Sequence, residues 1–157
     1  MKIELTVNGT RNEPDVKPGD TLLDTLRSLG YASVKDGCAN GDCGTCAVLL
    51  GERAVAACLI FSGQADGAQI TTIEGFASAD GQLHPLQQTM LDTGGVQCGY
   101  CIPGMILTAA DLLRREPDAS REEVATYLAG NLCRCTGYTK QLEAIDLAAE
   151  MLRGENL

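Results

Sequence analysis

The sequence lacks several features that would point to common classes of protein. It has no tryptophan and one histidine, and aromatic residues make up only 4% of its 157 residues. Basic residues are also scarce, since 12 Lys and Arg stand against 21 Asp and Glu and leave a formal net charge of −9. Such a chain is not suited to nucleic acid, whose phosphates require Lys and Arg, or to docking on anionic membranes.

Long hydrophobic runs are missing as well. No stretch reaches the roughly 20 apolar residues that span a bilayer. The first seven residues alternate polar and apolar side chains and do not form the apolar centre of a signal peptide. We therefore expect no membrane insertion and a cytoplasmic location, where grouped thiols bind metal more often than they form disulfides.

Eight cysteines stand out against this background, in two groups of four. The first group has the spacing C-x4-C-x2-C-x11-C, which is typical of plant-type ferredoxins, whose four thiolates hold one [2Fe–2S] cluster. It consists of Cys38, Cys43, Cys46 and Cys58. Zinc sites more often show paired C-x2-4-C knuckles, so this spacing favours iron–sulfur. Rieske ligation would need two histidines, and the single histidine, His84, is expected at a helix start or on the surface.

The second group is spaced C-x2-C-x31-C-x-C and is less specific. It consists of Cys98, Cys101, Cys133 and Cys135. A structural zinc ion would require the same four thiolates, so the spacing alone leaves iron and zinc open.

The first 75 residues predict a sheet crossed by one helix. Asn8-Gly9 is a hairpin turn signal, Gly51-Glu52 marks a second hairpin, and leucines recur at helical spacing before Gly30. The strands are expected at 3–7, up to about 16, 47–50, 53–58 and 70–73, with a helix over 22–29. With a metal loop between helix and strand, this is a β-grasp pattern.

The remaining chain predicts a helical bundle. Residues 76–82 are expected to form a linker, because they are small or polar and show no hydrophobic period. Helices are expected near 84–93, 103–115, 121–129 and 139–152, and four short helices suggest a small bundle. The predicted fold class is therefore α+β, with domains at 1–75 and 83–157.

Single residues of the bundle are assigned by their spacing. The predicted core contains Leu86, Met90, Met105, Ile106 and Leu112. The last helix is expected to carry Leu142, Ile145, Ala149 and Leu152 on one face. A solvated helix face is expected at Asp111, Arg114, Arg115 and Glu116.

Three longer motifs carry a family resemblance. They are Gly37-Cys38 with Cys43-Gly44-Thr45-Cys46, the stretch Gln97-Cys98-Gly99-Tyr100-Cys101-Ile102-Pro103-Gly104, and the stretch from Gly130 to Tyr138 around Cys133-Arg134-Cys135. In this order they resemble the small iron–sulfur subunit of the xanthine dehydrogenase, or molybdenum hydroxylase, family. The likeness covers nearly the whole chain. Ala39 and Thr45 depart from the residues most often found there, and neither is a ligand.

The resemblance implies a function for the chain as part of a complex. It implies two [2Fe–2S] clusters on this chain, in a plant-type ferredoxin-like domain and a four-helix domain. A large partner would carry molybdopterin, as the cytosine dinucleotide, and a medium partner FAD. Single electrons would pass from the pterin to the cluster of the second cysteine group, then to that of the first, and on to the flavin or another acceptor. Gln97 and the backbone at Cys135 would contact the pterin.

No residue of this chain is expected to be catalytic. The sequence shows no nucleophile–base pair and no phosphate-binding loop, so the chain would belong to an oxidoreductase complex without turning over substrate itself. Two alternatives remain open from the cysteines alone: a free-standing ferredoxin-type carrier and a zinc-stabilised interaction module.

Overall fold

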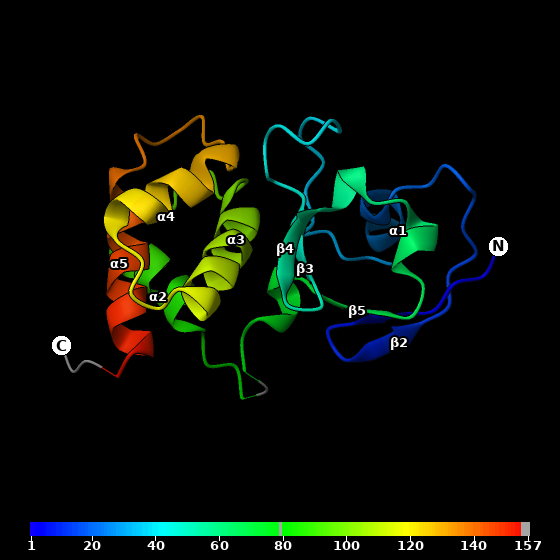
Figure 1. The fold of residues 1–157 in the computed structure, drawn as a ribbon, viewed down its shortest axis with the longest axis horizontal. Helices are drawn as coiled ribbons and strands as arrows, with labels where there is room; N and C mark the ends of the chain where they lie inside the picture. The colour runs from blue at the N-terminus through cyan, green and yellow to red at the C-terminus, as the bar shows by residue number, and fades with distance from the viewer. Residues whose placement is uncertain (79, 155–157) are drawn as a thin grey trace.

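The structure, a computed structural model, describes residues 1–78 and 80–154 and contains two hydrophobic cores side by side (Figure 1). One core is built from residues between Ile3 and Ile70 and the other from residues between Leu86 and Ala149. The predicted α+β class is confirmed. The domain limits at 75 and 83 stay a prediction, and residue 79 of the expected linker and residues 155–157 lie outside the described part of the chain.

The N-terminal unit is a five-stranded mixed sheet with one covering helix. Its strands are β1 (Leu5–Val7), β2 (Thr10–Asn12), β3 (Ala47–Leu50), β4 (Arg53–Ala56) and β5 (Ala68–Thr71), in the spatial order β2-β1-β5-β3-β4. β1 pairs antiparallel with β2 and parallel with β5, while β3 is antiparallel to both of its neighbours. Helix α1 (Leu22–Ser28) begins at a capping box of Thr21 and Asp24 and buries Leu22 and Leu26 in this core.

Short 3₁₀ turns occupy positions that the sequence pattern assigned to strands or loops. They are η1 (Ala57–Leu59), η2 (Ser62–Ala65) and η3 (Ile73–Gly75). The predicted strand over 53–58 was wrong at its end, because β4 stops at Ala56 and Cys58 lies in η1. In a strand, successive side chains point to opposite faces of the sheet, whereas in this 3₁₀ turn the Cys58 side chain does not follow that alternation.

The C-terminal unit is the predicted set of helices. They are α2 (Pro85–Asp92), α3 (Ile102–Arg115), α4 (Arg121–Tyr127) with the 3₁₀ turn η4 (Leu128–Gly130), and α5 (Thr139–Leu152). His84 caps α2, and its Nδ1 accepts a hydrogen bond from the Leu86 amide at 3.2 Å, so its expected place at a helix start is confirmed. All five predicted core residues are buried. In the described part of the chain, no helix is long and apolar enough to cross a membrane.

The inward face of α5 differs from the expected one by about one residue. Its buried positions are Gln141, Ala144, Ile145, Ala148 and Ala149. Leu142 is half-buried and packs against the helical core, whereas Leu152 is 48% exposed and does not share the buried face. The true face runs along i, i+3, i+4 and i+7 from a glutamine.

The two units meet where α3 packs across β3 and β4. At the closest point, a Cβ on Gly104 of α3 would lie 2.2 Å from the carbonyl oxygen of Gly44. Gly44 itself has φ +67°, and a Cβ there would lie 2.6 Å from the carbonyl oxygen of Gly130. Only glycine fits at both positions, because the backbones are in direct contact.

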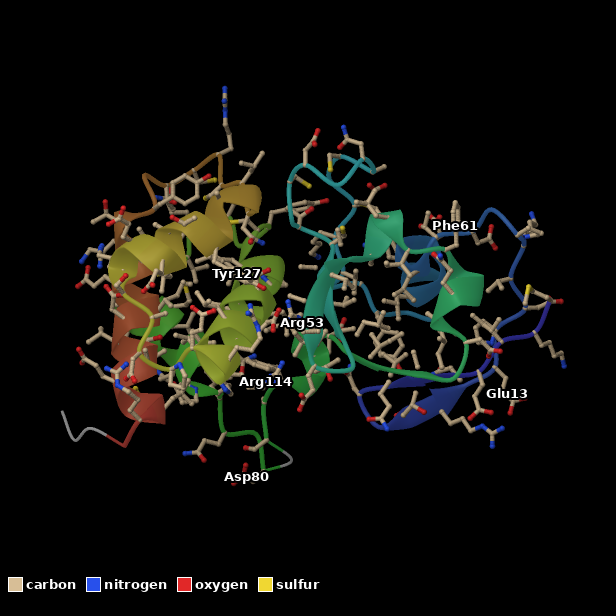
Figure 2. All side chains as sticks on the ribbon, in the orientation of Figure 1. Glu13, Arg53, Phe61, Asp80, Arg114 and Tyr127 are labelled. Atoms are coloured by element: carbon tan, nitrogen blue, oxygen red, sulfur yellow. The ribbon has the colours of Figure 1, made fainter. Side chains whose placement is uncertain are left out.

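Asp111 of α3 links this helix to the sheet at the same interface. Its carboxylate is completely buried and accepts hydrogen bonds from the Ala54 amide at 3.0 Å, the Tyr127 hydroxyl at 2.8 Å and the Arg115 Nε at 3.0 Å. Figure 2 shows Arg53, Arg114 and Tyr127 gathered where α3 faces β4. The expectation that Asp111 belongs to a solvated face was therefore wrong, because β4 is the last strand of the sheet and its Ala54 amide needs an acceptor.

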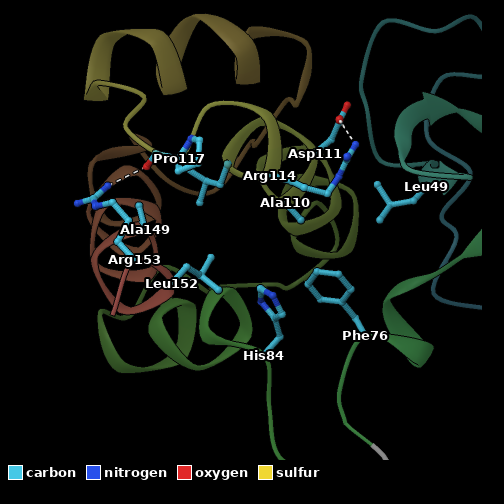
Figure 3. Close-up of a pocket in the computed structure, with 11 residues that line it drawn as sticks. Leu49, Phe76, His84, Ala110, Asp111, Arg114, Pro117, Ala149, Leu152 and Arg153 are labelled. Atoms are coloured by element: carbon cyan, nitrogen blue, oxygen red, sulfur yellow. Dashed lines mark hydrogen bonds and ion pairs between the residues drawn. The ribbon is translucent and has the colours of Figure 1, made fainter. Parts of the chain in front are cut away.

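A pocket of about 440 Å³ opens at the junction of the two units, lined by Leu49, Phe76, His84 and residues of α3 and α5 (Figure 3). The rings of Phe76 and His84 stack across it with centroids 4.3 Å apart. Phe76 belongs to the expected linker, yet it packs against the helical core. None of the eight cysteines lines this pocket, so it is separate from the candidate site.

We predict that Asp111→Ala lowers the free energy of unfolding by about 3 kcal/mol, because it strips a buried acceptor from two donors and a guanidinium. Urea denaturation followed by circular dichroism measures this loss. Burial raises the pKa of Asp111, but its hydrogen bonds to Ala54, Tyr127 and Arg115 outweigh burial and hold the pKa below the usual value. The stabilisation should thus be complete above pH of about 4 and disappear as the pH falls through the lowered pKa.

The control is Asp118→Ala, which removes a carboxylate that is 92% exposed and lies 3.8 Å from Arg153. It should change the stability far less. Equal losses in the two variants would contradict the role assigned to Asp111.

We also predict that Gly104→Ala destabilises the protein by about 1–3 kcal/mol, because its methyl group must displace the Gly44 backbone. Gly137→Ala is the matched control, since a Cβ there meets nothing within 4 Å. Thermal unfolding of the two variants should separate them clearly. A melting temperature for Gly104→Ala as high as that of the control would show that the contact is not tight.

Candidate metal centres

The first cysteine group forms two pairs in the loop between α1 and β3 and in η1. Besides the Asn40 amide, the Cys43 thiol lowers the pKa of Cys38, and besides burial the Cys58 thiol raises the pKa of Cys46, so the four thiols are neighbours in two pairs. Cys46 and Cys58 are 2% and 7% exposed, whereas Cys38 and Cys43 are half-buried. The group therefore has an inner pair in the core and an outer pair toward the surface.

The second group shows the same arrangement at the helix ends. Besides burial, Cys133 raises the pKa of Cys101, and Cys98 raises the pKa of Cys135, so these thiols are neighbours in two pairs. Cys101 is buried and Cys133 half-buried, while Cys98 and Cys135 are exposed. Along the sequence, the pair Cys101 and Cys133 lies between the two members of the pair Cys98 and Cys135. This follows because the chain passes Cys98 and Cys101 before α3 and returns in the opposite direction after α4.

The pairing bears on the kind of metal group that these thiols suit. In residues 1–78 and 80–154, no three Cys, His, Asp or Glu side chains are gathered so as to hold a single ion. A zinc site made of four cysteines needs all four thiolates around one ion. A [2Fe–2S] cluster instead distributes its four protein ligands over two irons, two on each. Each group of four cysteines has the number of thiols that one such cluster requires.

Hydrogen bonds favour the thiolate form at one cysteine of each group. Hydrogen bonds from the Asn40 amide, the Cys43 thiol and neighbouring amides lower the pKa of Cys38 to about 7. Burial raises the pKa of Cys133, but hydrogen bonds led by the Thr136 hydroxyl outweigh it and lower the pKa to about 6. Burial raises the pKa of Cys46 to about 11 and that of Cys101 to about 12. Thiolates are the metal-binding form, and a bound cation would favour it at the buried positions too.

The first loop is shaped around its sulfurs by glycines and one hydroxyl. A Cβ on Gly37 would lie 2.8 Å from the Cys43 Sγ, so a larger residue would intrude on the ligand. The Thr45 hydroxyl lies 3.2 Å from the same sulfur. Glycine at position 37 thus leaves the space that the Cys43 sulfur occupies.

The two cysteine loops are joined directly by their backbones. The Leu132 amide, next to Cys133, donates a hydrogen bond of 3.0 Å to the Cys43 carbonyl. The Asn131 side chain donates to the Gly44 carbonyl at 3.3 Å. In Figure 1 the two loops lie along the same edge of the molecule. Sequence reasoning did not find this junction, because its partners lie far apart along the chain.

The residues assigned to the pterin by resemblance lie at the surface. Gln97 is exposed next to Cys98, and Cys135 is exposed beside it in the same outer pair. The structure adds two residues that the sequence did not single out, Thr136 and Gln141, whose side chains point to sulfurs of the inner pair. The feature of the sequence that could have identified Gln141 is a polar residue at the helical spacing of the inward face of the last helix.

Known proteins match both units. A family described as "2Fe-2S iron-sulfur cluster binding domain" matches residues 5–72, and one described as "[2Fe-2S] binding domain" matches residues 72–146. The small FeS subunit of nicotinate dehydrogenase from Eubacterium barkeri is 48% identical over 96% of both chains. The iron-sulfur-binding subunit of xanthine dehydrogenase from Escherichia coli O157:H7 is 44% identical over 88% of this chain and 87% of its own.

Solved structures share the whole fold. Quinoline 2-oxidoreductase from Pseudomonas putida 86 superposes with a TM-score of 0.91 at 38% identity, over 99% of this chain and 98% of its own. Aldehyde oxidoreductase from Desulfovibrio desulfuricans superposes with a TM-score of 0.92 at 43% identity, where this chain corresponds to 17% of a longer polypeptide. Together with the two family matches, these likenesses show that the chain belongs to the small iron–sulfur subunits of the molybdenum hydroxylase, or xanthine dehydrogenase, family.

Proposed function

We propose that this chain is the electron-transfer subunit of a molybdenum hydroxylase complex, linking a molybdopterin site on a large partner to an electron acceptor. The observation that carries the proposal is the direct junction of the two cysteine loops through the Cys43 carbonyl and the Leu132 amide. A protein that binds two metal groups only for stability has no need to join their ligand loops. One that moves electrons between them gains a short connection.

Each group of four cysteines would hold one [2Fe–2S] cluster, which takes up and releases a single electron. Cys38 and Cys43 would bind one iron and Cys46 and Cys58 the other, as their pairing supports. In the helical unit, Cys98 with Cys135 and Cys101 with Cys133 would do the same. The chain itself would turn over no substrate.

The surrounding residues would hold these ligands and balance their charge. Amides of Asn40, Asp42 and Cys43 face the Cys38 sulfur, and hydrogen bonds of this kind stabilise the more negative, reduced state of a cluster. Gly37 leaves the space that the Cys43 sulfur occupies.

The exposure of the two outer pairs supports a direction for the proposed transfer. Cys98, Cys135 and Gln97 lie at the surface of the helical unit, where a pterin held by the large partner would contact them. Leu59, the last residue of the turn that carries Cys58, and Phe61, two residues after it, are 59% and 53% exposed. They offer an apolar surface for a second partner, which we propose to be the medium FAD subunit. The molybdopterin would be the cytosine dinucleotide form, and the complex would work in the cytoplasm, where thiols stay reduced.

We predict that Cys46→Ala and Cys133→Ala each abolish a different cluster. EPR spectra of the reduced protein should show two distinct signals, of which each variant loses one, because the two groups of ligands are separate. Iron should fall from about four to about two atoms per chain. Loss of both signals in either variant would contradict independent sites, and a colourless, folded, iron-free protein would favour the zinc alternative.

We further predict that the chain co-purifies with molybdenum. A tagged chain expressed in its native cells should bring down a larger polypeptide, with molybdenum in stoichiometric amount to the complex. Metal analysis and mass spectrometry of the eluate measure both. A native protein that carries iron but elutes as a lone monomer without molybdenum would instead support the free-standing carrier.

A further inference from the structure

Gln141 occupies a position where the helical core would accept an apolar side chain. It lies on the inward face of α5 with Ala144, Ile145 and Ala148, and it is only 1% exposed. Burying an amide without hydrogen-bond partners is unfavourable. The side chain therefore needs polar partners inside the core.

Those partners are a hydroxyl and two cysteine sulfurs. The Gln141 Nε2 lies 3.7 Å from the Cys133 Sγ and 3.9 Å from the Cys101 Sγ. Its Oε1 accepts a hydrogen bond of 2.9 Å from the Thr136 hydroxyl. The same hydroxyl lies 3.2 Å from the Cys133 Sγ, so Thr136, Gln141 and the inner pair of thiols form one network.

The chemistry of the network fixes how the amide is turned. Thiolates can accept hydrogen bonds but cannot donate them. The opposite orientation would place the amide oxygen against two sulfurs that become negative when they bind metal. The amide thus presents both of its hydrogens to the sulfurs.

We infer that Gln141 raises the reduction potential of the cluster in the helical unit, by donating N–H···S hydrogen bonds to Cys101 and Cys133 while Thr136 holds the amide in place. An added electron makes the ligand sulfurs more negative, so donors to them stabilise the reduced state. The effect is strengthened by burial, since Cys101 is 7% exposed and water screens it little. The inference rests on the proposed function, because it requires that these thiols hold the cluster.

The consequence concerns the direction of electron flow. A higher potential makes this cluster a better acceptor for electrons that arrive at the exposed pair Cys98 and Cys135. Gln141 acts from the opposite, buried side, on the inner pair. It can therefore set the potential without obstructing the surface that a partner would contact.

The test is Gln141→Leu in the intact complex, with the potentials measured by EPR-monitored redox titration. Leucine keeps a similar volume and removes both donors. We expect the midpoint of the signal that Cys133→Ala abolishes to become more negative. The ratio of reduced to oxidised cluster at a fixed potential should fall about tenfold, which is about 59 mV for a one-electron couple. The midpoint of the other signal should not move.

Ile145→Val is the matched control. It loosens the same face of α5 by one methyl group, one turn further along, and leaves the donors in place, so it should not shift the potential. Thr136→Val is a second variant, which frees the amide and removes a hydroxyl near Cys133. Thr136→Val should shift the midpoint in the same direction as Gln141→Leu. It therefore tests the inference even if Gln141→Leu assembles its cluster poorly.

The outcomes separate this inference from the proposed function. A wild-type protein without two iron–sulfur signals would reject the proposed function itself. If both signals are present, an unmoved or more positive midpoint in Gln141→Leu overturns the role of Gln141. An equal shift in Ile145→Val also overturns it. If Gln141→Leu cannot be titrated, an unmoved midpoint in Thr136→Val overturns the role of Gln141 instead.

Discussion

The direct contact between the backbones of Gly44 and Gly104 is the constraint on which the rest of the structure depends. The Gly44 carbonyl lies so close to α3 that a Cβ on Gly104 would be 2.2 Å away. This contact brings the first cysteine loop against the start of the helix that follows Cys101. It also allows the Leu132 amide to reach the Cys43 carbonyl at 3.0 Å. A side chain at either glycine would separate the ligand loops by about the thickness of a methyl group.

A backbone contact of this kind is not stable alone, because it buries little apolar surface. At the other end of the same helix, the buried Asp111 carboxylate accepts a hydrogen bond from the Ala54 amide of the sheet. Arg114 adds hydrogen bonds to the carboxylate and carbonyl of Glu52 at 2.8 and 2.6 Å. The helix is thus fixed at both ends against the sheet, so the distance between the cysteine loops is set by rigid elements rather than by a flexible linker.

The sequence predicted what depends on local pattern and missed what depends on distant partners. Helix positions, the two hairpins and the cap at His84 follow from periodicity and turn chemistry within a few residues, and these predictions are confirmed. Asp111 looked solvated because its helical neighbours are charged, whereas its partner Ala54 lies 57 residues earlier. Gln141 was missed because Leu142 and Leu152 suggested an inward face displaced by about one residue. The pairing of the thiols likewise depends on how the loops meet, which spacing does not encode.

In the helical unit, the division of the cysteine group into an inner and an outer pair explains how two thiols can be shielded from water while the other two remain accessible at the surface. The outer pair Cys98 and Cys135 is exposed, so a partner's cofactor can approach it without entering the core. The inner pair Cys101 and Cys133 is held among the helices, where Gln141 and Thr136 contact its sulfurs. Buried donors act strongly because no water competes with them. Under the proposed function, exposure would serve contact with partners, and burial would serve control of the electron's energy, within a single set of four ligands.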